Sequence, residues 1–215
     1  MNKFTSFSSI ALSLLFASSA YAGGAKYEVT VTNLTKSIFF TPIMVASHKK
    51  SVNLFELGAP ASDAISRTAE GGDTSQIAAI FQGKKDKVLS AGPLDKGESS
   101  TVVFENADRR GKISIASMLL PTNDAFVARS IHLPRGHQTK TVFLKAYDAG
   151  TETNDELCGN IPGPQCGGVP FSPEDEGEGF IHIHSGIHGI GDLNASMYTW
   201  NNPVMKVTIK RMHSY

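Results

Sequence analysis

The chain has 215 residues and a balanced charge, with 20 lysine and arginine residues against 20 aspartate and glutamate residues. This balance excludes the strongly basic surface by which proteins bind nucleic acid or a generic anionic membrane. Once a leader is removed, the length suits a single domain with a full hydrophobic core.

The first residues have the pattern of a secretory signal peptide. Lys3 supplies a positive charge, residues 10–16 are apolar, and Ala20-Tyr21-Ala22 places small residues at the positions that signal peptidase reads. We expect residues 1–22 to be the signal peptide and residues 23–215 to form the mature domain. The apolar stretch is too short to span a bilayer, and we expect no transmembrane segment. The predicted location is therefore secreted or periplasmic.

Alternating apolar and polar residues predict mostly β structure in the mature chain. Eight runs of this kind cover residues 26–33, 37–47, 99–105, 112–119, 125–133, 139–147, 180–184 and 204–210. Pro42 interrupts the second run, which favours an edge position or a bulge there. About eight strands separated by turns predict an all-β fold, an antiparallel β-sandwich.

Residues 60–83 break this pattern and predict a short helical insertion. Ser62 is a candidate N-cap for a helix that runs through Ala69 and is ended by the glycines at 71 and 72. A second short helix is predicted over residues 76–82. We expect the two helices to pack across one end of the sheets and to fill the core there.

Two cysteines, Cys158 and Cys166, flank a loop that contains Pro162-Gly163-Pro164. In an oxidising compartment such a close pair most simply forms a disulfide bond. A metal–thiolate site is the alternative, although the spacing is wider than in the usual zinc knuckle. The surrounding segment 151–179 is rich in glycine, proline and acidic residues, and its length predicts a loop that is functional or pinned by the disulfide.

Carboxylates stand at two junctions between a strand and a loop. Asp124 lies in the sequence Pro-Thr-Asn-Asp-Ala-Phe, and Asp148 lies in Ala-Tyr-Asp-Ala-Gly-Thr. Calcium takes six to eight oxygen ligands, several of them carboxylate. The two aspartates can supply this charge, with Asn123, Glu152 or Asp155 nearby. The alternative is that each aspartate only caps a local turn through its own backbone.

These two junctions also carry a resemblance to the spondin N-terminal domain. In that family an element P-x-x-D-W-F-V-G precedes an element Y-P-x-D-A-G-T-D, and residues 121–128 and 147–152 are similar to them, with Ala125 and Ala128 in place of the tryptophan and the glycine. Residues 154–158, 177–184 and 186–193 resemble further segments of bacterial stand-alone members. The resemblance spans nearly the whole mature chain.

The resemblance implies a β-sandwich that holds calcium at loop carboxylates. It implies Asp124 and Asp148 as calcium ligands, and it aligns Glu152 with the acidic residue that follows the Gly-Thr pair in the family. It also implies a non-enzymatic module for recognition or adhesion, whose partner is an extracellular protein or a glycan.

A histidine-rich segment offers a second candidate site. His182 and His184 are two residues apart on a predicted strand, so they share one face, and His188 and Asp192 follow across a glycine-rich turn. Three imidazoles and a carboxylate can hold zinc or copper. The isoleucines at 181 and 183 would then face the sandwich. The alternative is that the imidazoles bond the acidic loop or backbone carbonyls and only stabilise the turn.

The predicted function is thus an exported, calcium-binding recognition or adhesion module. The alternatives are a metal-dependent hydrolase, or a periplasmic transition-metal-binding protein, both using the histidine segment. Nucleophilic catalysis has little support, because no G-x-S-x-G elbow is present. His48 lies outside these motifs and is expected at the surface.

Overall fold

The computed structural model describes residues 24–136, 138–171 and 176–212. The predicted signal peptide lies outside these residues. Within them, the structure contains no helix that is both long enough and apolar enough to cross a membrane.

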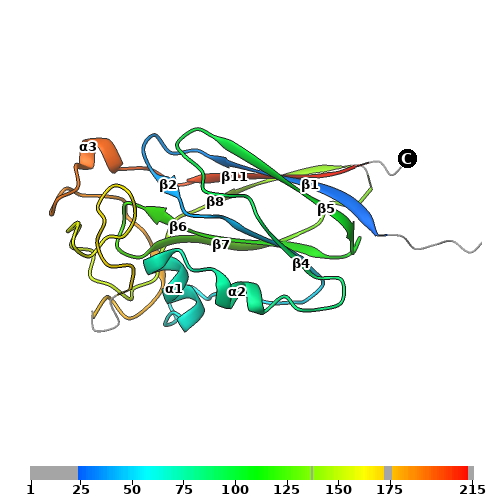
Figure 1. Ribbon diagram of the computed structural model, residues 1–215, viewed down its shortest axis with the longest axis horizontal. Coiled ribbons are helices and arrows are strands. Elements are labelled where there is room, and N and C mark those ends of the chain that lie inside the picture. The colour runs from blue at the N-terminus through cyan, green and yellow to red at the C-terminus, as the bar shows by residue number, and fades with distance from the viewer. Residues whose placement is uncertain (1–23, 137, 172–175, 213–215) are drawn as a thin grey trace, which may run out of the picture.

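Two antiparallel sheets form a sandwich (Figure 1). The first sheet has four strands, in the order β5 (Ser99–Ala107), β1 (Ala25–Asn33), β11 (Met205–Arg211) and β8 (Thr139–Leu144). The second has seven strands: β10 (His182–Ile183), β9 (Tyr147–Asp148), β7 (Ala125–His132), β6 (Lys112–Leu120), β3 (Met44–His48) and β4 (Lys87–Ser90), with β2 (Phe39–Phe40) beside β6. The predicted all-β sandwich is confirmed.

Strand alternation places the main core between the two sheets. On β1, Tyr27, Val29 and Val31 are buried, while the residues between them are only partly covered. Strands β1 and β11 lie side by side in the middle of the four-stranded sheet, with Val29 opposite Ile209. The sheet therefore pairs the first described strand of the chain with the last.

Two predicted strands are divided in the structure. The run over residues 37–47 is split at Pro42 into β2 and β3. The run over residues 139–147 leaves the four-stranded sheet after Leu144 and enters the seven-stranded sheet at Tyr147, where it becomes β9. The amide of Ala146 between them donates to the side chain of Asn202 at 2.7 Å, so the crossing point is tied down. Strand β4 was not expected from the sequence.

The two predicted helices are present but cover a different surface, and a third, short helix was not predicted. Helix α1 (Asp63–Gly71) starts after Ser62 and ends at Gly72, whose φ of 69° is the left-handed C-cap conformation. Helix α2 (Ser75–Ala79) follows. A short α3 (Ala195–Tyr198) lies at the end of the sandwich that carries the long segment after β9, which we call the loop end (Figure 1). Helices α1 and α2 lie on the outer face of the seven-stranded sheet and not across its end (Figure 1).

A second apolar cluster fills the space between α1, α2 and this sheet. Alanines at 46, 116 and 128 face the helices, and their small side chains allow a close approach. Ile65 of α1 and Ile77 of α2 are buried against them. Strands β3 and β6 are therefore covered on both faces.

His48 is buried at the end of β3, which corrects the expectation that it lies at the surface. Its side chain packs 4.3 Å from the ring of Phe81, and its Nε2 lies 2.8 Å from the hydroxyl of Ser114. Burial lowers the pKa of His48 below its ordinary value. The folded protein therefore keeps this imidazole neutral at a pH where an unfolded chain protonates it.

His48 is expected to make the protein less stable in mild acid. As pH falls below about 6.5, the unfolded chain takes up a proton that folded His48 resists, so the free energy of unfolding falls by up to about 1.4 kcal/mol per pH unit. Denaturant titrations between pH 7.5 and 5 measure this slope. His48→Gln should have a shallower slope, whereas His132→Gln, at an exposed position, should keep the wild-type slope. Equal slopes in wild type and His48→Gln would contradict the assignment.

Candidate metal centre

Three neighbouring strands bring acidic and imidazole side chains to one corner of the seven-stranded sheet. Asp124 ends the turn before β7, and Asp148 of β9 pairs with Ala125 of β7. On the other side of β9, His182 of β10 lies directly opposite Asp148. The strand register thus gathers three side chains that are far apart in the sequence.

Asp124 is fully buried and is held by the loop that follows β9. Its Oδ2 accepts hydrogen bonds from the backbone amides of Thr151 at 2.8 Å and Glu152 at 3.2 Å. Its Oδ1 is buried and has no hydrogen-bond partner within the described ranges. Burial, and then the neighbouring charge of Asp148, raise the pKa of Asp124 well above its ordinary value. A carboxylate in this position attracts a cation or a proton.

Asp148 is also buried, and both of its oxygens are engaged. Oδ1 accepts from the amide of Gly150 at 2.8 Å, and Oδ2 accepts from the side-chain amide of Asn154 at 2.9 Å. Burial raises the pKa of Asp148, and these two hydrogen bonds oppose the shift. Asp148 therefore does cap its own turn, as its residue type allows, while it also faces the neighbouring strands. Glu152 is buried beside the same turn.

Gly150 makes the close approach of β10 possible. Its φ is 65°, and a Cβ atom built on it would lie 2.3 Å from the carbonyl oxygen of Phe180. The amide of Gly179 donates to the carbonyl of Gly150 at 2.8 Å. A side chain at position 150 would push away the segment that carries Glu178 and His182.

His182 faces two carboxylates. Its Nε2 lies 3.4 Å from Oδ1 of Asp148 and 3.5 Å from Oε2 of Glu178. Its Nδ1 lies 3.2 Å from the carbonyl oxygen of Ile183, which can only accept, so Nδ1 carries the proton. Burial tends to lower the pKa of His182, but Asp148, the Ile183 carbonyl and Glu178 outweigh it, and the pKa is raised.

His184 is buried and has the opposite tautomer. Its Nδ1 accepts from the amide of Gly186 at 2.9 Å, so the proton of the neutral ring is on Nε2, which points to Oδ2 of Asp148 at 3.8 Å. Burial lowers the pKa of His184 to about 3, and the ring packs 4.9 Å from that of Trp200. At a distance of 3.8 Å, Nε2 makes no hydrogen bond to Asp148, and because it carries the proton, His184 offers no free lone pair to a metal.

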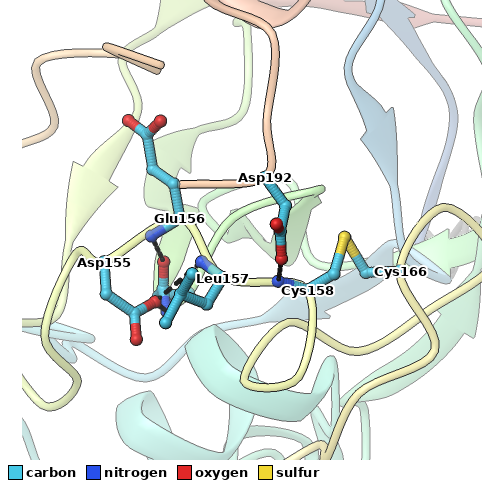
Figure 2. The surroundings of a disulfide bond; sticks show 7 residues. Asp155, Glu156, Leu157, Cys158, Cys166 and Asp192 are labelled. Carbon is cyan, nitrogen blue, oxygen red and sulfur yellow. Dashed lines mark hydrogen bonds between the residues drawn. A yellow bond between two sulfur atoms is a disulfide. The ribbon is translucent and has the colours of Figure 1, made fainter. Parts of the chain in front are cut away.

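His188 and Asp192 have other contacts. His188 is exposed, with its Nδ1 3.7 Å from Oε1 of Glu156. Asp192 accepts from the amide of Cys158 at 2.9 Å (Figure 2). In the described part of the chain, the one group of three or more ligand atoms within 4.8 Å of one another consists of Asp148, Glu178 and His182. The structure thus does not bring the four predicted residues of the histidine segment together.

The histidine strand is also less regular than predicted. Ile181 is buried in the cluster beneath the helices, whereas Ile183 is 43% exposed. Strand β10 is only two residues long, so the alternation expected over residues 180–184 does not persist. Glu178 approaches His182 from the loop before this strand, the acidic loop that the alternative interpretation named as a partner of the imidazoles.

Glu156 organises the neighbouring loop and was missed by sequence analysis. It is 2% exposed and has a φ of 57°. Its carboxylate accepts from three consecutive backbone amides, those of residues 188, 189 and 190, at 2.5, 2.7 and 3.0 Å. One signal was available, because Gly186, Gly189 and Gly191 surround this turn and glycines favour such a cradle of amides.

The disulfide between Cys158 and Cys166 is confirmed, with a Cα–Cα distance of 4.6 Å. Figure 2 shows the bond beside Asp192, with Asp155 and Glu156 on the adjoining segment. Asp155 accepts from the side chains of Asn123 at 3.0 Å and Asn160 at 2.6 Å. The long segment is therefore fastened both covalently and to the turn that carries Asp124.

Comparison with known proteins gives a family. A family model described as Spondin_N matches residues 30–156, which is more than half of the chain and includes both Asp124 and Asp148. No curated protein matches the chain.

Glu156→Gln should destabilise the protein although it replaces none of the candidate metal ligands. The substitution replaces one carboxylate oxygen, which accepts hydrogen bonds, with an NH₂ group, which can only donate and would face backbone N–H groups. We therefore expect the free energy of unfolding to fall by about 2–4 kcal/mol. Urea titration measures the loss. Glu176→Gln, the same change at an exposed site, should stay within about 0.5 kcal/mol of wild type. Equal stability of the two variants would contradict the assigned role of Glu156.

Proposed function

The chain belongs to the spondin N-terminal domain family, and we propose that it is an exported recognition or adhesion module whose loop end is stabilised by calcium. Membership of this family suggests a module for extracellular recognition or adhesion. The disulfide fits the same setting, because such bonds persist in oxidising compartments. Export would follow from the predicted signal peptide.

One observation carries the calcium proposal, namely the burial of Asp124 beside Asp148. None of the described lysine and arginine side chains forms an ion pair with either carboxylate. Burying two adjacent carboxylates without a cation is costly, which is why the pKa of both is raised. Calcium would supply the missing positive charge, and it prefers oxygen ligands of this kind.

The donor set fits calcium. Oδ1 of Asp124 is a buried acceptor without a hydrogen-bond partner in the described residues, and the Asp148 carboxylate lies beside it. Glu152, buried next to the same turn, is the third proposed ligand. Bound calcium would join the β6–β7 turn to the loop after β9, and so act as a cross-link between loops.

The recognition surface that we propose lies next to this cross-link. A cavity of about 610 Å³ separates α1 from the loops after β9 and before β10. Its lining includes Glu70, Thr151 and Glu176, together with Arg67, whose guanidinium lies 4.8 Å from the centre of the Phe171 ring. Carboxylates, a hydroxyl and an aromatic ring are groups that bind hydroxyl-rich or peptide ligands. The proposed partner is accordingly an extracellular protein or a glycan.

Calcium should raise the melting temperature of the mature protein. At about 100 times its dissociation constant, an ion that binds only the folded state adds about 2.7 kcal/mol, or roughly 5–10 °C for a domain of this size. Asp124→Asn should abolish this rise. In EGTA the variant should be at least as stable as wild type, because a neutral amide next to Asp148 removes the repulsion between two buried charges.

Asp95→Asn, at an exposed loop position, is the matched control and should keep the full calcium response. Differential scanning calorimetry in calcium and in EGTA compares the three proteins. A calcium-induced rise of the same size in Asp124→Asn and wild type would contradict the proposed site.

Ligand binding should depend on the cavity and on calcium. Arrays of extracellular glycans and matrix proteins, probed with mature protein in calcium or in EGTA, should give signals that are lost in EGTA. Arg67→Ala should lose these signals while keeping the calcium-induced thermal shift, because it removes a cavity side chain and no calcium ligand. Signals that persist in both conditions would contradict a calcium-dependent recognition end.

A further inference from the structure

The contacts of His182 with Asp148 and Glu178 are too long for charge-assisted hydrogen bonds. Such bonds between an imidazolium and a carboxylate are about 2.7–2.9 Å long, whereas the two distances here are 3.4 and 3.5 Å. Nε2 of His182 is inaccessible to solvent and has no hydrogen-bond partner in the described residues. The three groups are therefore close together but not bonded to one another.

The same distances match the edges of a coordination tetrahedron. Nitrogen and oxygen ligands bind zinc at about 2.0–2.2 Å, so two ligands of a tetrahedral ion lie about 3.3–3.6 Å apart. The two distances from His182 Nε2 fall within this range. The Asp148 and Glu178 oxygens lie within 4.8 Å of each other, which a small side-chain movement shortens.

Surrounding groups orient all three side chains as they do around known metal ions. The Ile183 carbonyl takes the Nδ1 proton of His182 and leaves the Nε2 lone pair free. The side-chain amide of Asn154 donates to Asp148 at 2.9 Å and to Glu178 at 3.3 Å, so one residue positions both carboxylates. An ion pair between His182 and the two carboxylates would require none of these three hydrogen bonds.

We propose that Asp148, Glu178 and His182 bind a divalent transition-metal ion of the zinc type. An imidazole ligand favours zinc over calcium and magnesium, which select oxygen. Three protein ligands leave the fourth position of a tetrahedral ion free. The open position would accept water or a donor atom from a ligand.

This site goes beyond the proposed calcium site and does not depend on it. The two share Asp148, but Asp124 belongs only to the calcium site, and Glu178 and His182 belong only to the zinc site. Substitutions of residues other than Asp148 therefore test the calcium site and the zinc site separately, whereas Asp148→Asn should weaken the binding of both ions.

Isothermal titration calorimetry with zinc chloride tests the proposal. The mature protein is made without a histidine tag and is freed of metal with a chelator. Wild type should bind one zinc ion per chain. Even the loss of an outer-shell partner lowers metal affinity about 10–100-fold, so His182→Gln and Glu178→Gln should each weaken zinc binding at least about 100-fold. Asp124→Asn should keep zinc binding while it loses the calcium response.

His188→Gln is the matched control, because it removes an exposed imidazole from a neighbouring loop. It should bind zinc with wild-type affinity. Glu178 is partly exposed, so its variant remains informative if His182→Gln fails to fold. Equal zinc affinities for wild type, His182→Gln and Glu178→Gln would overturn the proposal, as would a loss in His188→Gln as large as in His182→Gln.

Discussion

The pairing of β9 with both β7 and β10 is the constraint on which the loop end of the molecule depends. The chain crosses from the four-stranded to the seven-stranded sheet just before β9, and this short strand then lies between two others. Asp148 consequently has Asp124 on one side and His182 on the other. A slip of one residue between β9 and β7 would turn Asp148 away from Asp124, and a slip of β10 against β9 would turn His182 away from Asp148, because successive side chains of a strand point to opposite faces.

Within the described residues, backbone amides donate to the buried carboxylates of Asp124 and Glu156, and neither carboxylate forms an ion pair with lysine or arginine. Asp124 takes two amides from the loop after β9, and Glu156 takes three from the turn at residues 188–190. These hydrogen bonds hold the irregular segments in place, as interstrand backbone hydrogen bonds do for the strands. No described lysine or arginine side chain forms an ion pair with Asp148 either, and the proposed calcium site rests on that observation.

Local patterns in the sequence predicted most of the fold. Alternation indicated the long strands, and Ser62 and Gly72 bracket the first helix as capping rules suggest. The location of the helices on a sheet face was missed, because the signal lies in small residues on β3, β6 and β7. The candidate site was predicted in part: Asp124 and Asp148 were recognised from their junctions. The partnership of Asp148 with His182 depends on a strand pairing across 34 residues, which no local pattern reveals.

The central position of β11 also constrains when the sandwich can assemble. Strand β11 is the partner of both β1 and β8, so without it the four-stranded sheet separates into the β5–β1 pair and an isolated β8. The sheet cannot close until residues 205–211 have been synthesised. A growing chain that lacks them leaves one side of its core open to water, so the sandwich cannot be completed before they emerge. Late completion of the sandwich would suit the proposed export, because a translocation channel passes unfolded chains.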